Sequence, residues 1–251
     1  PQSVYQMNTG SILMGKPSLG AWAAYGLGTE NRDMPAFIVL PDPGGGLKGG
    51  PPAWGSGFLP GSYQGTTLRP GAKPILNLQP QPGISIGGQR RMLDRIGHLN
   101  REHLAGRDFD DRLAARVNAY ELAFRMQSAA PEIVDISRET EATRRLYGIG
   151  QKETNEFGTR CLLARRMVEK GVRFVQMYHG TGSAGTWDAH SDTKKRYDSE
   201  APKVDKPIPG LLKDLKQRGL LESTLVVFVT EFGRTPGAQG TGRTHHHQGL
   251  T

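Results

Sequence analysis

A helix, a short apolar strand and then a group of polar residues occur in this order twice in the second half of the chain. The first unit reads GTRCLLARRMVEKGVRFVQMYHG, and the second reads PGLLKDLKQRGLLESTLVVFVTEFGRTP. Short apolar strands that alternate with helices are typical of parallel α/β sheets. The repeated unit therefore predicts an α/β fold, with strands at VRFVQM and LVVFV.

Both predicted strands are followed by residues of the types that commonly bind metals or anions. They are His179, Asp188 and His190 after the first strand, and Glu231 and Arg234 after the second. Open parallel α/β sheets bind their ligands just outside the carboxyl ends of the strands. We therefore expect these groups to meet at one edge of the sheet, where oxygen and imidazole ligands indicate a metal-assisted hydrolase site.

The first half of the chain contributes a strand, a long loop and two helices. Residues 36–40, AFIVL, predict a buried strand, and residues 41–65 contain too much Gly and Pro for regular structure. Large side chains favour a loop anchored by burial over a disordered one. They are Trp54, Phe58, Leu59 and Tyr63. Apolar residues near a 3.6-residue period predict helices over 88–105 and 111–129, which we interpret as a helical insertion or cap over 88–130 of a single domain.

The charge balance narrows the range of partners. The chain has 32 basic and 24 acidic side chains, a net charge of +8, and the basic residues lie mostly on predicted helices. They form either solvated helix faces or a surface for an anionic substrate. Low aromatic content and the lack of a nucleic-acid motif argue against a nucleic-acid partner.

The remaining composition bears on redox state and membranes. Cys161 is the only cysteine, so no internal disulfide is possible, and its apolar helical surroundings predict a buried, inert thiol. The longest apolar run, LVVFV, is far shorter than the roughly 20 residues that span a bilayer, so no membrane span is predicted. Pro1 and the final QGLT do not resemble natural domain ends, which predicts an internal fragment of a longer protein.

Asp188 and His190 are separated by one residue in WDAHSD. In an extended loop their side chains point to opposite sides, whereas a turn brings both onto one ion. The alternative is that Asp188 caps a turn and His190 is solvated.

Glu231 follows LVVFVT directly, and a carboxylate at the end of a buried strand is costly unless it is paired or bound to a cation. One interpretation is a structural ion pair with Arg234. The other makes Glu231 a metal ligand and Arg234 a clamp for sulfate or phosphate oxygens, which a guanidinium binds through two hydrogen bonds.

Three consecutive histidines, His245, His246 and His247, lie near the end of the chain in GRTHHHQG. Imidazole is a common ligand of zinc, whereas calcium and magnesium prefer oxygen. Because consecutive residues do not all face one ion, we expect one or two of the three to coordinate.

Eight blocks along the chain resemble, in the same order, the sulfatase-like family named domain of unknown function 1501. They are GKPSLGAWAAYGLGTEN, GFLPGSYQGT, LNREHL, ELAFRMQ, LLARRMVEKGVRFVQMYHG, WDAH, LKQRGLLESTLVVFVTEFGRTP and GRTHHHQG. The resemblance implies the alkaline phosphatase-like superfamily, whose members fold as a three-layer αβα sandwich and hydrolyse phosphate and sulfate esters at a metal centre. It implies an incomplete sandwich here, because the family's Gly-Gly-Pro-Ser segment and nucleophile position are absent from these residues. It also implies an exported protein, periplasmic or secreted.

The resemblance implies roles for particular residues. Asp188 and His190 match the family's W-D-x-H block, which resembles the metal-binding Asp and His of the superfamily. Glu231 matches the E-F-G-R-T-P block as a further ligand, and Arg234 matches the same block as the contact for the anionic group. His245 and His246 match a block usually written G-R-D-H-H.

Thr244 stands where that last block has its aspartate. The residues and the resemblance together predict a divalent metal (zinc, calcium or magnesium) and an anionic small-molecule or glycan ester as substrate. The predicted function is a metal-dependent hydrolase of sulfate or phosphate esters. The alternative is a non-catalytic binding or scaffold relative that keeps the fold, which Thr244 favours.

Overall fold

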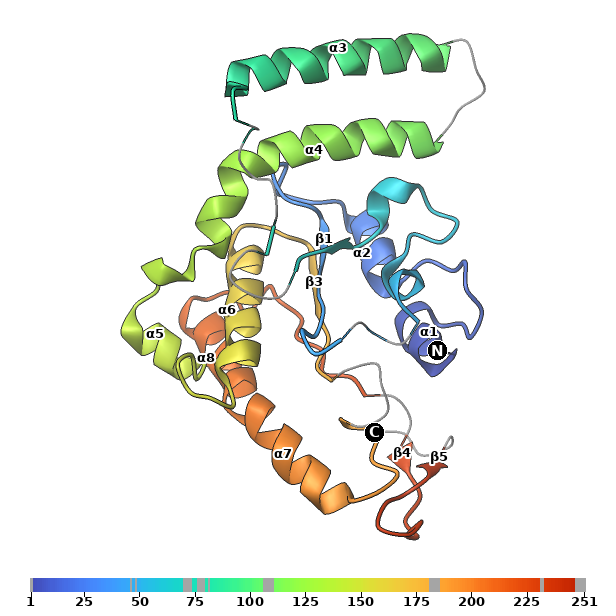
Figure 1. Ribbon diagram of the computed structural model, residues 1–251, viewed down its shortest axis with the longest axis vertical. Coiled ribbons are helices and arrows are strands. Elements are labelled where there is room, and N and C mark those ends of the chain that lie inside the picture. Colours follow the sequence, from blue (N-terminus) through green and yellow to red (C-terminus); the bar gives the residue numbers. More distant parts are fainter. Residues whose placement is uncertain are drawn as a thin grey trace.

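The computed structural model describes residues 2–45, 47, 49–69, 74–75, 80, 82–105, 111–180, 186–230 and 233–246. They form a mixed α/β fold with a small parallel sheet (Figure 1). The helices are α1 (Gln2–Thr9), α2 (Leu19–Leu27), α3 (Ile86–Ala105), α4 (Asp111–Val134), α5 (Glu141–Leu146), α6 (Asn155–Glu169), α7 (Thr193–Asp205) and α8 (Pro207–Gln217), with short 3-10 helices η1 (Pro51–Trp54), η2 (Gly61–Tyr63) and η3 (Ile136–Arg138). The strands are β1 (Phe37–Leu40), β2 (Thr66–Thr67), β3 (Phe174–Met177), β4 (Gly233–Arg234) and β5 (His245–His246).

The parallel sheet has the strand order β2-β1-β3. Phe37 of β1 pairs with Phe174 of β3, and the register continues to Leu40 and Met177. The predicted strands at AFIVL and VRFVQM are therefore confirmed. Because β1 is the central strand, all four of its side chains are buried.

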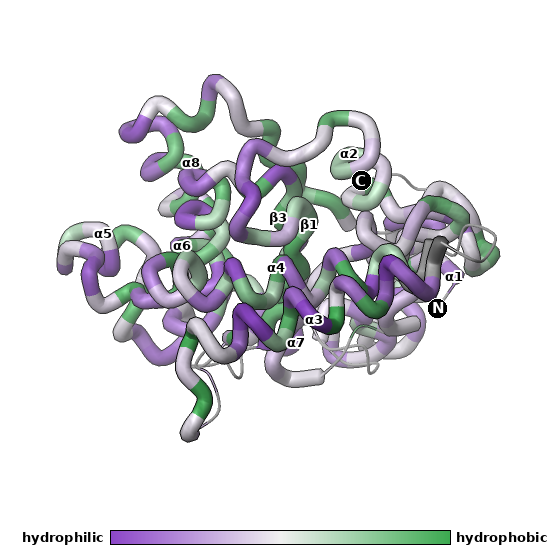
Figure 2. Tube along the Cα trace, turned by 90° about the horizontal axis from the view of Figure 1, so that it is seen from above, coloured by the Kyte–Doolittle hydropathy of each residue, from purple (hydrophilic) through white to green (hydrophobic). Residues whose placement is uncertain are grey.

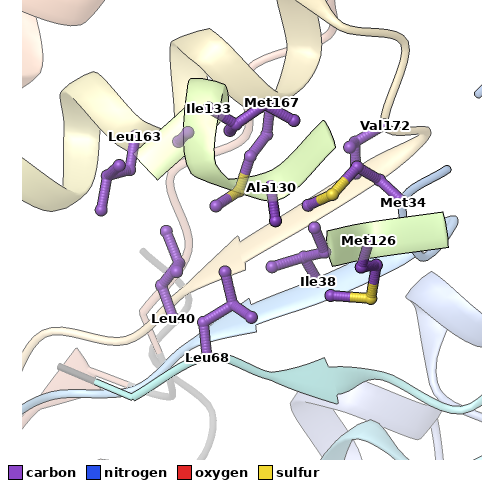
Figure 3. Close-up of a cluster of buried hydrophobic side chains, with 11 residues drawn as sticks. Met34, Ile38, Leu40, Leu68, Met126, Ala130, Ile133, Leu163, Met167 and Val172 are labelled. Carbon is purple, nitrogen blue, oxygen red and sulfur yellow. The ribbon is translucent and has the colours of Figure 1, made fainter. Parts of the chain in front are cut away.

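Helices cover both faces of β1. Ile38 and Leu40 pack into an apolar cluster with residues of α4 and α6 (Figure 3). Phe37 and Val39 face the other way, against Ala24 of α2. Each such side chain stabilises the fold by about 1.5–3 kcal/mol through the apolar area it removes from water. Figure 2 shows the apolar β1 and β3 at the centre, with more hydrophilic helices around them.

The predicted helices at 88–105 and 111–129 are confirmed as α3 and α4, and α4 continues to Val134. Both Nη atoms of Arg90 on α3 donate to the carboxylate of Glu121 on α4, at 2.8 and 2.7 Å. The two helices lie side by side, with α3 on the outside (Figure 1). Of the helices described in this structure, none is long and apolar enough to cross a membrane.

The long loop after β1 is partly anchored, as expected from its large side chains. Leu59 is buried, and the Trp54 ring packs on Tyr178 with centroids 6.0 Å apart. Phe58 is exposed instead, where it contacts the ring of Trp22.

Cys161 lies on α6 and is fully buried, as predicted. Burial raises the pKa of its thiol to about 12, because the charged thiolate is poorly solvated there. The thiol is therefore protonated and unreactive at neutral pH.

The predicted strand at LVVFV is wrong. Residues 225–229 follow α8 without forming a strand, and Leu225 and Phe228 are 87% and 76% exposed. A continuous apolar run suits a strand that has neighbours and is covered on both faces. Within the described ranges, however, β3 pairs only with β1, and no strand lies beside 225–229.

Candidate metal centre

Three of the predicted ligands come together in space. Asp188 and His190 lie in the loop between β3 and α7, and His245 lies on β5. The Asp188 Oδ1 atom is 3.1 Å from Nε2 of His190 and 3.1 Å from Nε2 of His245. One donor atom from each residue lies within 4.8 Å of the other two. We call Asp188, His190 and His245 the metal group.

Two tight turns place Asp188 and His190 on the same side of their loop. The Ala189 N–H donates to the Trp187 carbonyl at 2.9 Å, and the His190 N–H donates to the Asp188 carbonyl at 3.2 Å. Hydrogen bonds between residues two positions apart are those of γ-turns, which bend the backbone sharply. Of the two arrangements open from the sequence, the loop therefore adopts the one in which both side chains face one point.

A two-stranded antiparallel ladder supplies the third ligand and a cation. Arg234 on β4 pairs directly with His245 on β5. The Arg234 Nη2 donates to Asp188 Oδ1, and its Nη1 donates to the Arg243 carbonyl at 2.9 Å. The predicted partner, Glu231, lies outside the described residues, and the ion pair seen here joins Arg234 to a residue of the metal group.

Hydrogen bonds connect this ladder to the loop of Asp188. The Asp192 N–H donates to Thr241 Oγ1 at 2.9 Å, and the Thr193 N–H donates to the Thr241 carbonyl at 3.2 Å. The Arg243 N–H donates to the carbonyl of Ala189 at 3.3 Å. His245 is thereby placed against Asp188, although 57 residues separate them.

Gly242 makes this contact sterically possible. A Cβ atom at this position would lie 2.2 Å from both the carbonyl carbon and the oxygen of His190. The two backbones are therefore in direct contact, and any side chain would separate them. In the sequence, Gly242 gives only a weak signal, a glycine beside a turn, which does not mark it as a site residue.

The carboxyl group of Asp188 is ionised at neutral pH. Partial burial raises its pKa, but hydrogen bonds from His245 and Arg234, together with the Arg234 charge, outweigh burial and hold the pKa below its usual value. A carboxyl group must lose its proton before it can bind a metal. The Asp188 side chain therefore carries the negative charge that a cation ligand needs.

The metal group could hold a small divalent ion. Zinc binds nitrogen and oxygen ligands at about 2.0–2.2 Å, so the ligand atoms of a tetrahedral site lie about 3.3–3.6 Å apart. The two 3.1 Å separations around Asp188 Oδ1 are a little shorter than that spacing, and the three donor atoms all lie within 4.8 Å of one another. A zinc ion held by three protein ligands would keep one position open, as in catalytic zinc sites.

The other predicted residues either lie outside the described part of the chain or have other surroundings in it. Glu231 and His247 lie outside the described residues. His246 follows His245 on β5, so its side chain points to the opposite face. Its Nδ1 atom is buried without a hydrogen-bond partner among the described residues. His179 lies after β3, where its Nδ1 accepts a hydrogen bond from Trp187 Nε1 at 2.8 Å.

Comparison with known families gives one result that covers the whole chain. A family model described as "Protein of unknown function (DUF1501)" matches residues 1–251. The match includes the sheet, the α3–α4 pair and the metal group. No curated protein and no solved structure matches this chain.

Proposed function

We propose that this chain, which belongs to the DUF1501 family, provides the metal site of a metal-dependent hydrolase of sulfate or phosphate esters. The proposal depends on one observation: the metal group gathers two imidazoles and a carboxylate beside the guanidinium of Arg234. We propose further that the parallel sheet, with helices on both faces, is part of an αβα sandwich of the alkaline phosphatase-like type.

The chemistry divides between the ion and the protein. A bound divalent cation would polarise the ester oxygen and stabilise the charge that develops on it. Arg234 would bind two oxygens of the sulfate or phosphate group, a geometry that a guanidinium matches. Because Arg234 is paired with Asp188 in this structure, it is already held beside the ligands of the ion.

The donor set favours zinc among the three predicted metals. Two of the three ligand atoms are imidazole nitrogens, which zinc accepts readily, whereas calcium and magnesium take mainly oxygen ligands. We therefore propose zinc as the resident ion. The net charge of +8 supports an anionic small-molecule or glycan ester as substrate. We also propose that the protein is exported, either periplasmic or secreted.

The direct experiment is to measure zinc binding and ester hydrolysis in the natural protein and in His190→Ala and His245→Ala. Zinc content is measured by mass spectrometry, and activity is screened with aryl sulfates and aryl phosphates. We expect about one zinc per chain, an affinity at least about 100-fold weaker in each variant, and loss of hydrolysis, since a ligand contributes more than the 10–100-fold of outer-shell groups.

His98→Ala is the matched control, because His98 is an exposed histidine on α3 that pairs only with Glu102 among the described residues. It should bind zinc like the natural protein. Hydrolysis that persists in the double variant of His190 and His245 would refute the proposal. Tight binding of a sulfated glycan without turnover, in zinc-loaded protein, would instead support the non-catalytic alternative.

A further inference from the structure

A hydrogen bond ties the loop of the metal group to the end of the sheet. The Trp187 Nε1–H donates to Nδ1 of His179 at 2.8 Å, and the two rings lie 5.7 Å apart. Trp187 directly precedes Asp188, and His179 is the second residue after β3. The bond therefore fixes the chain one residue before a metal ligand to a rigid element.

His179 is a well-placed acceptor. Its ring packs edge-on against Phe157 of α6, with centroids 4.9 Å apart. Burial lowers its pKa, so the imidazole is neutral near pH 7 and one ring nitrogen can accept a hydrogen bond; the contact with Trp187 assigns this role to Nδ1. The next residue is held as well, because the Gly180 N–H donates to Oδ2 of Asp42 at 2.9 Å.

The side chain of Asp188 has no comparable anchor of its own. Its contacts with other described residues go to His190, His245 and Arg234. All three belong to the site and would rearrange when a cation binds. A fixed position for Asp188 must therefore come through its two neighbours in the chain. The Ala189 carbonyl accepts hydrogen bonds from Arg243 and Thr193, whereas Trp187 connects the loop to the end of the sheet.

We propose that Trp187 and His179 are positioning residues of the metal group. The indole N–H held by the imidazole sets the place of Asp188, and the tight turn that follows sets the place of His190. The inference rests on the proposed function, because the property it controls is the affinity for the proposed metal. Neither residue touches the ion, so both act as outer-shell groups that typically change metal affinity 10–100-fold.

The test separates the hydrogen bond from the packing of the rings. Trp187→Phe removes the N–H and keeps an aromatic ring, whereas His179→Leu removes the acceptor. His179→Asn keeps an acceptor, because the amide oxygen takes the place of Nδ1. Zinc affinity is measured by competition with a chelating dye, and the visible absorption of the cobalt form reports the ligand geometry.

We expect Trp187→Phe and His179→Leu each to weaken zinc binding about 10–100-fold and to change the cobalt spectrum. The double variant should be no worse than either single variant, because both remove the same bond. His179→Asn should bind like the natural protein. Tyr197→Phe is the matched control, since the ring of Tyr197 also packs against Trp187, with centroids 5.9 Å apart.

Amide hydrogen exchange at Ala189 and His190, measured without metal, gives a second readout. It should accelerate in Trp187→Phe and His179→Leu and stay unchanged in His179→Asn. The inference would be overturned if Trp187→Phe showed the same exchange rates, zinc affinity and cobalt spectrum as the natural protein. If the natural protein binds zinc but hydrolyses no ester, only the proposed function fails. If the natural protein binds no zinc, the exchange rates still decide the inference: faster exchange in Trp187→Phe supports the positioning role of Trp187, and unchanged exchange overturns it.

Discussion

Gly242 illustrates how much of the site depends on single residues that carry no chemistry. The backbone around it touches the backbone of His190, and only hydrogen fits between them. This contact holds the β4–β5 ladder against the loop of Asp188. The position of His245 is therefore set by a residue that offers no ligand atom.

Gly242→Ala should weaken zinc binding by at least about tenfold and destabilise the fold by about 1–3 kcal/mol, the usual cost of overpacking. The reason is that the new methyl group must push the ladder away from His190. Thermal unfolding and zinc titration measure the two effects. Gly237→Ala is the control, because a Cβ there meets nothing within 4 Å. Equal behaviour of the two variants would contradict the steric account.

Residue type and position were enough to select Asp188, His190 and His245, whose donor atoms the structure brings together. Asp188 and His190 follow a strand of the parallel sheet, as the sequence indicated, whereas His245 was selected from its histidine run and lies on the separate β4–β5 ladder. Gly242 and Trp187 were not predicted as site residues. Their roles depend on which backbone or ring lies opposite, which only the tertiary fold determines.

At the scale of elements, two apolar runs of similar composition behave differently. AFIVL forms β1, in which Val39 is 0% exposed between β2 and β3. LVVFV follows a helix in the same way, yet Val227 is 60% exposed. A run of apolar residues predicts a strand, but the strand forms only where a neighbour accepts its backbone hydrogen bonds.

Val227→Lys should change the free energy of unfolding by no more than about 0.5 kcal/mol and improve solubility, because it places a charge on an exposed apolar segment. The same substitution at Val39 should cost more than about 4 kcal/mol, because it buries an unpaired charge. Chemical denaturation measures both. A loss at Val227 as large as at Val39 would mean that residues 225–229 are buried in solution.

Most long elements followed from sequence patterns. Helical periodicity located α3 and α4, the repeated helix–strand unit located α6 and α8, and apolar runs located β1 and β3. The two-residue strands β2, β4 and β5 were not predicted, because two residues are too few to show a pattern. Their pairing results from contacts between distant segments, as for Arg234 with His245.

At the scale of the whole molecule, a buried ionic network joins α6 and α8 to the segment after η3. Arg165 is 1% exposed and contacts Glu139 at 2.7 Å and Asp214 at 2.9 Å. Tyr147 donates to the other side of the network, from its hydroxyl to Asp214 Oδ2 at 2.8 Å. Arg166 and Arg218 also pair with Glu139. Asp214 and Glu169 pair with both Arg165 and Arg218, so three carboxylates share these guanidinium groups.

Glu139→Gln should lower the free energy of unfolding by about 3–5 kcal/mol at neutral pH, because it removes the carboxylate that pairs with Arg166 and one of those around the buried Arg165. Urea denaturation measures the loss. Glu141→Gln should cost less than about 1 kcal/mol, because Glu141 forms an exposed pair with Arg145. Equal losses would show that burial of the network contributes little.

The same network predicts how stability depends on pH. Burial raises the pKa of Glu139, but the hydrogen bonds and charges of Arg165 and Arg166 outweigh burial, so the folded-state pKa lies below the ordinary value of 4.5. A lowered pKa contributes stability that is complete above about pH 4.5 and is lost as the pH falls through the folded-state pKa. The free energy of unfolding should therefore decrease below about pH 4.5 in the natural protein. Glu139→Gln should show a shallower decrease, and identical slopes would contradict this assignment.

The burial of Cys161 gives this chain a practical advantage for spectroscopy. Its only native sulfhydryl lies inside α6 and does not react at neutral pH. A cysteine introduced at an exposed position will therefore be the sole attachment point for a maleimide dye or a nitroxide spin label. Movements of the α3–α4 pair relative to the sheet can then be followed without first removing any natural side chain.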